Sequence, residues 1–88
     1  MDTALDATSL SRLKWRCRRG MLENDLFVER FFQRHGDTLT VGQARGLEAL
    51  MDLADNDLLD LLMARRELQP ELDRPEVQEV LALLRQRP

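Results

Sequence analysis

The 88-residue sequence has a single cysteine and a single histidine. One cysteine rules out an internal disulfide framework, and one histidine leaves no set of ligands with zinc-site spacing. No apolar run approaches the roughly 18 residues that a membrane-spanning helix needs. The N-terminal sequence has neither the basic start nor the apolar centre of a signal peptide, and its acidity argues against a mitochondrial transit peptide. We therefore expect a protein of a reducing compartment, most simply the bacterial cytoplasm, with no membrane contact.

Sequence motifs of catalysis are also lacking. There is no phosphate-binding glycine loop, no dinucleotide-binding fingerprint and no nucleophile-elbow glycine pattern beside Ser9 or Ser11. His35 is best explained by a favourable interaction with the C-terminal end of a helix dipole. Cys17 lies on the apolar side of the first expected helix, which indicates a small buried hydrophobic residue rather than a nucleophile. We therefore expect no enzyme with a catalytic centre of its own.

Charge is distributed unevenly along the chain. Residues 1–20 carry a net charge of +3 and the remaining residues carry −6, so the whole chain carries −3. The stretch 46–64 contains no basic residue and five acidic ones, Glu48, Asp52, Asp55, Asp57 and Asp60. It lacks the glycine and terminal glutamate of a calcium loop, so we expect helix capping and a solvated surface instead of a metal site. Two oppositely charged sides suit oriented docking onto one partner.

Apolar residues recur at intervals of three and four along the chain, and no segment alternates with a period of two. This pattern predicts an all-α fold, a compact single-domain bundle of five helices over residues 9–88, preceded by a flexible tail over residues 1–8. The first helix is expected to run from Thr8 or Ser9 to about Arg19 and to end at Gly20. The second is expected to start within residues 21–24 and to reach His35.

Capping patterns mark the other helix starts: Thr40 with Gln43, Asp55 or Asn56, and Asp73 with Pro75 and Glu76. The fourth helix is apolar on nearly all sides and is therefore expected to be central. Leu22 and Leu26 are expected to share the buried stripe of the second helix with the phenylalanines.

The most unusual composition lies in residues 15–25, here named the corner. Its sequence is Trp15-Arg16-Cys17-Arg18-Arg19-Gly20-Met21-Leu22-Glu23-Asn24-Asp25. Trp15 and Met21 are candidate apolar anchors for a partner, and Arg19 and Glu23 are candidate polar contacts. Gly20 would let another backbone approach where any side chain would collide. A local interpretation, in which Gly20 caps the helix and Arg19 pairs with Glu23, accounts for the residues about equally well.

The basic first helix permits a second interpretation. Cations beside a tryptophan can clamp phosphates and stack a base, as in nucleic-acid-binding proteins. The acidic balance of the whole chain argues against nucleic acid as the partner. Arginine outnumbers lysine twelve to one, which favours bidentate protein contacts over a diffuse electrostatic track.

The corner resembles the signature of the SdhE-type succinate dehydrogenase assembly factors, also called FAD assembly factors or flavinators. Their Arg-Gly-x-x-Glu motif matches Arg19, Gly20 and Glu23. The resemblance covers about residues 10–86. This chain differs from the family pattern at Leu61, where members often carry a tryptophan, and in the connector 65–70.

The resemblance implies a small all-helical protein that binds the flavoprotein subunit of succinate dehydrogenase or fumarate reductase. It would promote covalent attachment of FAD to a histidine of that subunit, so FAD belongs to the partner and the assembly factor has no cofactor of its own. Carried over by position, the partner-binding residues are Arg19, Gly20, Met21, Glu23 and Asp25, and Trp15 joins them as the neighbouring apolar anchor. Antitoxin-like relatives keep open the alternative of a nucleic-acid-binding or antitoxin-like regulator that uses the basic first helix. An unrelated interaction module is a further alternative.

Overall fold

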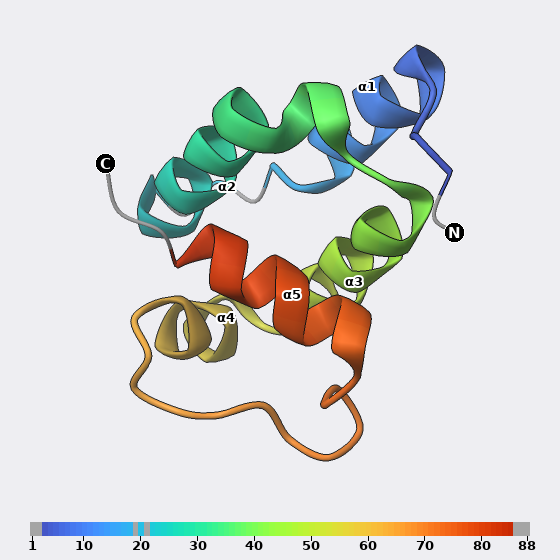
Figure 1. Cartoon of the computed structure of the whole chain (residues 1–88). Helices are drawn as coiled ribbons and strands as arrows, with labels where there is room; N and C mark the ends of the chain where they lie inside the picture. The colour runs from blue at the N-terminus through green and yellow to red at the C-terminus, as the bar shows by residue number, and fades with distance from the viewer. Residues whose placement is uncertain (1–2, 19, 21, 86–88) are drawn as a thin grey trace.

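The computed structural model describes residues 3–18, 20 and 22–85. Within these ranges the chain forms α1 (Ala7–Arg16), α2 (Leu22–His35), the short 3₁₀ helix η1 (Gly36–Thr38), α3 (Val41–Met51), α4 (Asp55–Leu62) and α5 (Pro75–Leu84). In Figure 1, α1 and α2 form the upper part, α3 and α5 lie in the middle, and α4 with the connector 63–74 forms the lower part. The predicted all-α, five-helix, single-domain fold is confirmed. None of the described helices is long and apolar enough to cross a membrane.

The α3–α5 pair forms the centre of the core. Leu47 and Leu50 of α3 and Val77 and Val80 of α5 are completely buried. The two helices approach each other closely at Gly46, where a Cβ atom would lie 2.4 Å from the backbone oxygen of Glu76. Glycine is therefore the residue that lets these two backbones come together.

The fourth helix is not central, contrary to the prediction from its composition. Leu58, Leu61 and Leu62 of α4 are buried, but Met63 is 48% exposed at its end. An eight-residue helix has little more than two turns, so its apolar residues can fill the gap between α2 and α5 without the helix being surrounded.

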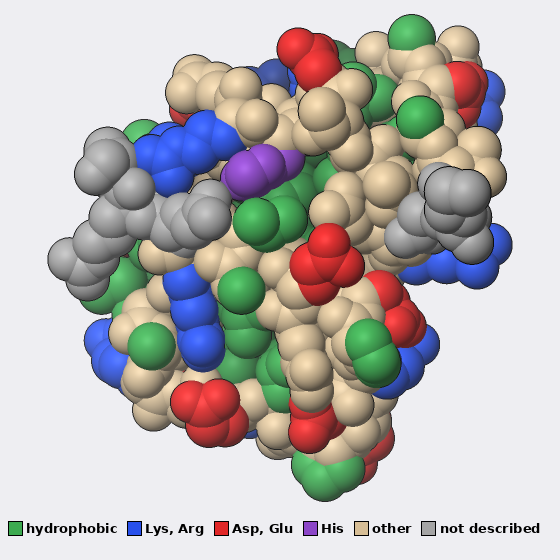
Figure 2. Space-filling view, viewed as in Figure 1, with side chains coloured by type: hydrophobic (Ala, Val, Ile, Leu, Met, Phe, Trp, Pro, Cys, Tyr) green, Lys and Arg blue, Asp and Glu red, His purple; other side chains and the backbone are tan. Residues whose placement is uncertain are grey.

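The face of the molecule that carries α5 has acidic and basic side chains scattered between apolar ones (Figure 2).

The end of α4 has the hydrogen bonds of a Schellman motif. The Ala64 N–H donates to the Leu61 oxygen at 3.1 Å, and the Arg65 N–H donates to the Asp60 oxygen at 2.8 Å. Ala64 has a φ of +59°, in the left-handed conformation that this motif requires. The Arg85 Nε donates to the same Leu61 oxygen at 2.7 Å, which ties the end of α5 to the end of α4.

The capping box at the start of α3 is confirmed. The Gln43 N–H donates to the Thr40 hydroxyl at 3.1 Å, and the Thr40 N–H donates to the Gln43 side-chain oxygen at 3.0 Å.

The other two predicted caps are wrong by one residue. Ala54 precedes α4, and Asp55 lies inside its first turn, where its charge favours the helix dipole. Arg74 precedes α5, and the Asp73 carboxylate accepts a hydrogen bond from the Gln78 side chain instead of from the helix end.

The segment before α1 is hydrogen bonded, in contrast to the loose tail predicted for residues 1–8. The Leu5 N–H donates to the Leu39 oxygen at 2.9 Å, and the Val41 N–H donates to the Thr3 oxygen at 2.8 Å. Helical periodicity carries no signal for such a short pairing between distant segments, and α1 accordingly starts at residue 7, before the predicted capping residues. The division of the chain into a tail and a domain at residue 8 stays a prediction.

Candidate functional site

The first helix ends earlier than predicted, and a turn separates it from α2. Arg16 is its last residue and Cys17 is its C-cap, with the Cys17 N–H donating to the Leu13 oxygen at 3.0 Å. Cys17 is completely buried, as predicted, and so fixes the end of α1 against the core. The Arg18 N–H donates to the Trp15 oxygen at 3.2 Å. Arg18 and Gly20, which follow Cys17, are exposed.

Gly20 has a φ of +82°, which confirms the predicted left-handed conformation. A Cβ atom built at this position meets nothing within 4 Å. The residue is exposed, so the space beside it is open to solvent. A Cβ atom at Gly20 would strain the backbone but would meet no described residue apart from its chain neighbours within 4 Å.

The predicted partner-binding residues have different surroundings. Trp15 is 72% exposed, and the Arg18 guanidinium lies 5.3 Å from the centre of its ring. Glu23 and Asp25 both lie in the first turn of α2. They are two positions apart, so they lie about 200° apart around the helix. Glu23 is exposed and Asp25 is half-buried. The structure therefore does not bring these two carboxylates together. Arg19 and Met21 lie outside the described residues.

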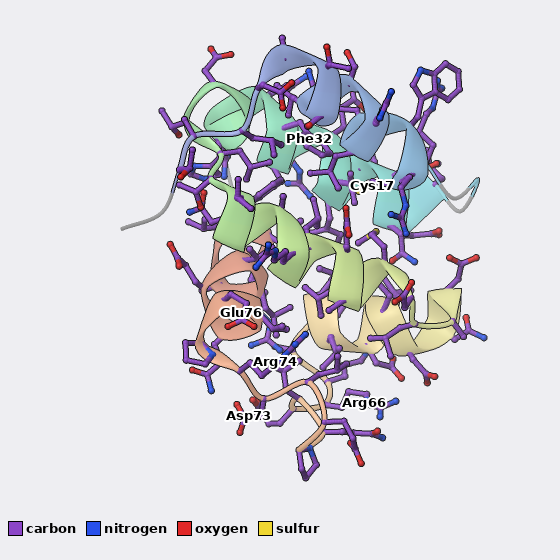
Figure 3. All side chains as sticks on the ribbon, turned by 90° about the vertical axis from the view of Figure 1, so that its right-hand side faces the viewer. Cys17, Phe32, Arg66, Asp73, Arg74 and Glu76 are labelled. Atoms are coloured by element: carbon purple, nitrogen blue, oxygen red, sulfur yellow. The ribbon has the colours of Figure 1, made fainter. Side chains whose placement is uncertain are left out.

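A groove of about 610 Å³ lies between α1 and α2, next to the corner. It is lined by Lys14, Cys17, Arg18, Asp25, Val28, Glu29, Phe32 and Gln33. Cys17 and Phe32, on the two sides of this groove, are labelled in Figure 3. The Lys14 ammonium lies 5.8 Å from the centre of the Phe32 ring. The cations of the groove come from the α1 side and its carboxylates from α2, so the two walls carry opposite charge.

The buried side of α2 differs from the predicted stripe. Leu22 and Leu26 are 68% and 47% exposed, whereas Asn24, Val28 and Phe31 are buried. The Asn24 side-chain amide donates to the backbone carbonyl oxygen of Asp55 at 3.0 Å and thereby joins α2 to the start of α4. This hydrogen bond gives the buried side-chain nitrogen a partner. With Asn24 on the buried side of α2, Leu22 and Leu26 lie on the exposed side. The spacing of four and three between Asn24, Val28 and Phe31 could have indicated the buried face of α2. Using it would have required assigning an asparagine to the core.

The acidic residues of α4 interact with the connector. Asp57 forms an ion pair with Arg66 at 2.9 Å, and Asp60 forms one with Arg65 at 3.2 Å. These carboxylates therefore help to attach the connector to α4. Within the described ranges, no three or more histidine, cysteine or acidic side chains are grouped as a metal site would require.

Comparison with known proteins identifies the family. The profile of the family described as flavinator of succinate dehydrogenase matches residues 11–88. The chain belongs to this family. The FAD assembly factor SdhE of Ralstonia nicotianae is 53% identical to this chain over 75 residues, which cover 85% of this chain and 79% of that protein.

More distant relatives carry the same name. The FAD assembly factor SdhE of Legionella pneumophila is 40% identical over 68 residues, covering 77% of this chain and 86% of that protein. The protein of that name from Vibrio cholerae is 40% identical over 57 residues, covering 65% and 66% of the two chains. No solved structure matches the chain. The comparisons confirm the resemblance seen in the corner sequence, while the roles of individual corner residues stay predictions.

Proposed function

We propose that this protein docks its corner on the flavoprotein subunit of succinate dehydrogenase and promotes covalent attachment of FAD to that subunit. The relatives are named as FAD assembly factors, and the family is described by the same process. A fumarate reductase flavoprotein is a second partner of the same chemistry, and the bacterial cytoplasm is the proposed compartment.

The open space at Gly20 carries the proposal. The family motif Arg19-Gly20-Met21-Leu22-Glu23 includes a left-handed, exposed glycine with nothing within 4 Å of its Cβ position. The backbone conformation explains why this position is glycine, and the open space beside it leaves room for a partner to approach. A partner backbone that lies against Gly20 gives this space a role.

The proposed contribution of the flavinator is positioning. Covalent attachment joins the flavin to a histidine of the partner, and both reacting groups belong to the partner complex. Holding two reactants in a productive geometry can accelerate a reaction by several orders of magnitude without any acid–base group from the helper. The proposal therefore assigns neither a catalytic residue nor a cofactor to this chain.

The nucleic-acid alternative has less support. Arg16 of the basic first helix forms an ion pair with Glu48 of α3 at 3.6 Å. The carboxylates of Asp25 and Glu29 line the same groove as Lys14 and Arg18, where they would repel a phosphate backbone. Steeply salt-dependent binding to nucleic acid would nevertheless favour this alternative.

The proposal is tested by mixing the purified protein with FAD and the apo flavoprotein subunit and measuring covalently bound flavin by in-gel fluorescence. We expect Gly20→Gln to lower the rate of attachment by about tenfold or more, because the new side chain occupies the space of the partner. Ala64→Gln is the matched control, since Ala64 is also exposed with a positive φ but lies at the end of α4. An equal loss in both variants would contradict the proposal.

Glu23→Ala tests the polar part of the corner in the same assay. Glu23 is exposed, so its removal leaves the core intact, and we expect weaker binding to the flavoprotein. Glu71→Ala removes an equally exposed glutamate from the connector and should have no effect. Unchanged affinity of Glu23→Ala would remove this residue from the proposed contact.

A further inference from the structure

The groove between α1 and α2 is continuous with the corner but is not explained by the corner motif. Arg18 lines the groove and also stacks against Trp15. Asp25 belongs both to the corner and to the groove. The volume of about 610 Å³ falls within the range of roughly 300–1,000 Å³ that is typical of binding clefts. A partner seated on the corner would therefore also lie over this groove.

The groove has an apolar floor between two walls of opposite charge. Val28 is buried and Phe32 half-buried between the helices. Lys14 and Arg18 form the basic wall on the α1 side, and Glu29 contributes to the acidic wall on α2. An occupant that fits has an apolar group at its centre, an acidic group on one side and a basic group on the other.

The outer surface of α2 extends the apolar area past the acidic wall. Leu22 and Leu26 are four positions apart and therefore lie on one side of the helix, next to the position of Glu29. They are 68% and 47% exposed. Contiguous exposed apolar surface can mark a protein-interaction site, and the two leucines enlarge the apolar area beside the groove.

We propose that the α1–α2 groove, together with the exposed Leu26 beyond its acidic wall, is a second contact with the flavoprotein and receives an apolar side chain flanked by an acidic and a basic residue. This inference rests on the proposed function, because it names a further part of the same interface. A polypeptide fits the groove better than a free nucleotide, since Asp25 and Glu29 would repel its phosphates and a nucleotide gives the exposed leucines no partner.

The inference is tested by measuring the dissociation constant of the complex with the apo flavoprotein by titration calorimetry. Lys14→Glu reverses one of the two charges of the basic wall and so cancels its net charge. Arg12→Glu is its control, because it makes the same charge change on the same helix at a residue that does not line the groove. Leu26→Ser removes the exposed apolar side chain beside the groove. Met63→Ser is its control, since Met63 is 48% exposed and Leu26 is 47% exposed. We expect the groove variants to bind about tenfold more weakly and the controls to bind within about twofold of the wild type.

The outcomes separate the inference from the proposed function. If Gly20→Gln loses binding but the groove variants bind like the wild type, the corner contact stands and the groove contact is wrong. If Lys14→Glu and Arg12→Glu weaken binding equally, only the general charge of α1 matters and the groove is again excluded. If the wild type does not bind the flavoprotein, both proposals fail. Binding of FAD to the flavinator alone, lost in Lys14→Glu, would replace the polypeptide occupant with a nucleotide.

Discussion

Two glycines of this protein differ in the space that surrounds them. Gly46 lies where α3 and α5 meet, and a Cβ atom there would be 2.4 Å from a backbone oxygen. Gly20 lies in the turn between α1 and α2, and a Cβ atom there would meet nothing within 4 Å. Gly46 has no room for a side chain, whereas Gly20 has room but holds a φ of +82°.

The difference indicates that Gly46 contributes to the stability of the fold, whereas Gly20 lies on a surface that is free to contact a partner. The α3–α5 contact requires glycine because of packing, so a change at Gly46 should act on folding. The corner requires glycine because of backbone conformation, and the space beside it is not used by the described chain. Stability and partner binding should therefore respond separately to changes at the two positions.

The largest effect on stability is expected for Gly46→Ala. Overpacking of a core costs about 1–3 kcal/mol or more, and the obstacle here is the backbone oxygen of Glu76, which cannot rotate away as a side chain can. The better helix propensity of alanine recovers about 1 kcal/mol. We expect a net loss of about 2 kcal/mol in the free energy of unfolding, measured by urea denaturation.

Gly36→Ala provides the control for this prediction. Gly36 is also buried, but its nearest non-neighbouring atom is the Phe32 Cδ1 at 4.0 Å from the Cβ position, an ordinary contact distance. Its unfolding free energy should change by less than about 1 kcal/mol. Equal losses at Gly46 and Gly36 would show that the α3–α5 contact is not unusually tight.

The sequence predicted the elements of this fold better than their orientation. The apolar spacing revealed all five helices, and the Thr40–Gln43 capping box and the left-handed Gly20 were predicted from local rules that depend on only a few neighbouring residues. The outward rotation of Leu22 and Leu26 depends on Asn24, which bonds a residue 31 positions away. Local periodicity contains no information about such a contact.

The candidate site shows the same limit. The corner was recognisable because its unusual residues are consecutive in the sequence. The groove combines Lys14 and Arg18 of one segment with Glu29 and Phe32 of another, and only the folding of the chain brings the two segments together. The close approach at Gly46 was missed for the same reason, since its partner is the backbone of a distant helix.

The second largest effect is expected for a size series at Gly20. Gly20→Ala and Gly20→Gln should each lose about 1 kcal/mol of stability, because the cost comes from the left-handed backbone and not from contacts. Affinity for the flavoprotein should instead fall further with the larger side chain. Urea denaturation and calorimetric titration of the same samples separate the two effects. A stability loss that grows with side-chain size would mean that the space beside Gly20 is occupied by the protein itself.

The smallest effect on the free energy of unfolding is expected for Ala64→Gly, which should stabilise the protein, whereas the changes at Gly46 and Gly20 should destabilise it. Ala64 holds a φ of +59° in the Schellman motif after α4, where the left-handed conformation costs an alanine about 1 kcal/mol. Glycine removes this strain but gains freedom in the unfolded chain, so we expect a net stabilisation of about 0.5 kcal/mol.

Urea denaturation should therefore give a slightly higher midpoint for Ala64→Gly than for the wild type. Because Ala64 is exposed and leads into the connector rather than the corner, affinity for the flavoprotein should not change. A loss of stability would mean that the Ala64 methyl group contributes more than its backbone strain costs. In that case the left-handed residue at position 64 would serve the packing of α4, whereas the left-handed residue at position 20 leaves space for a partner.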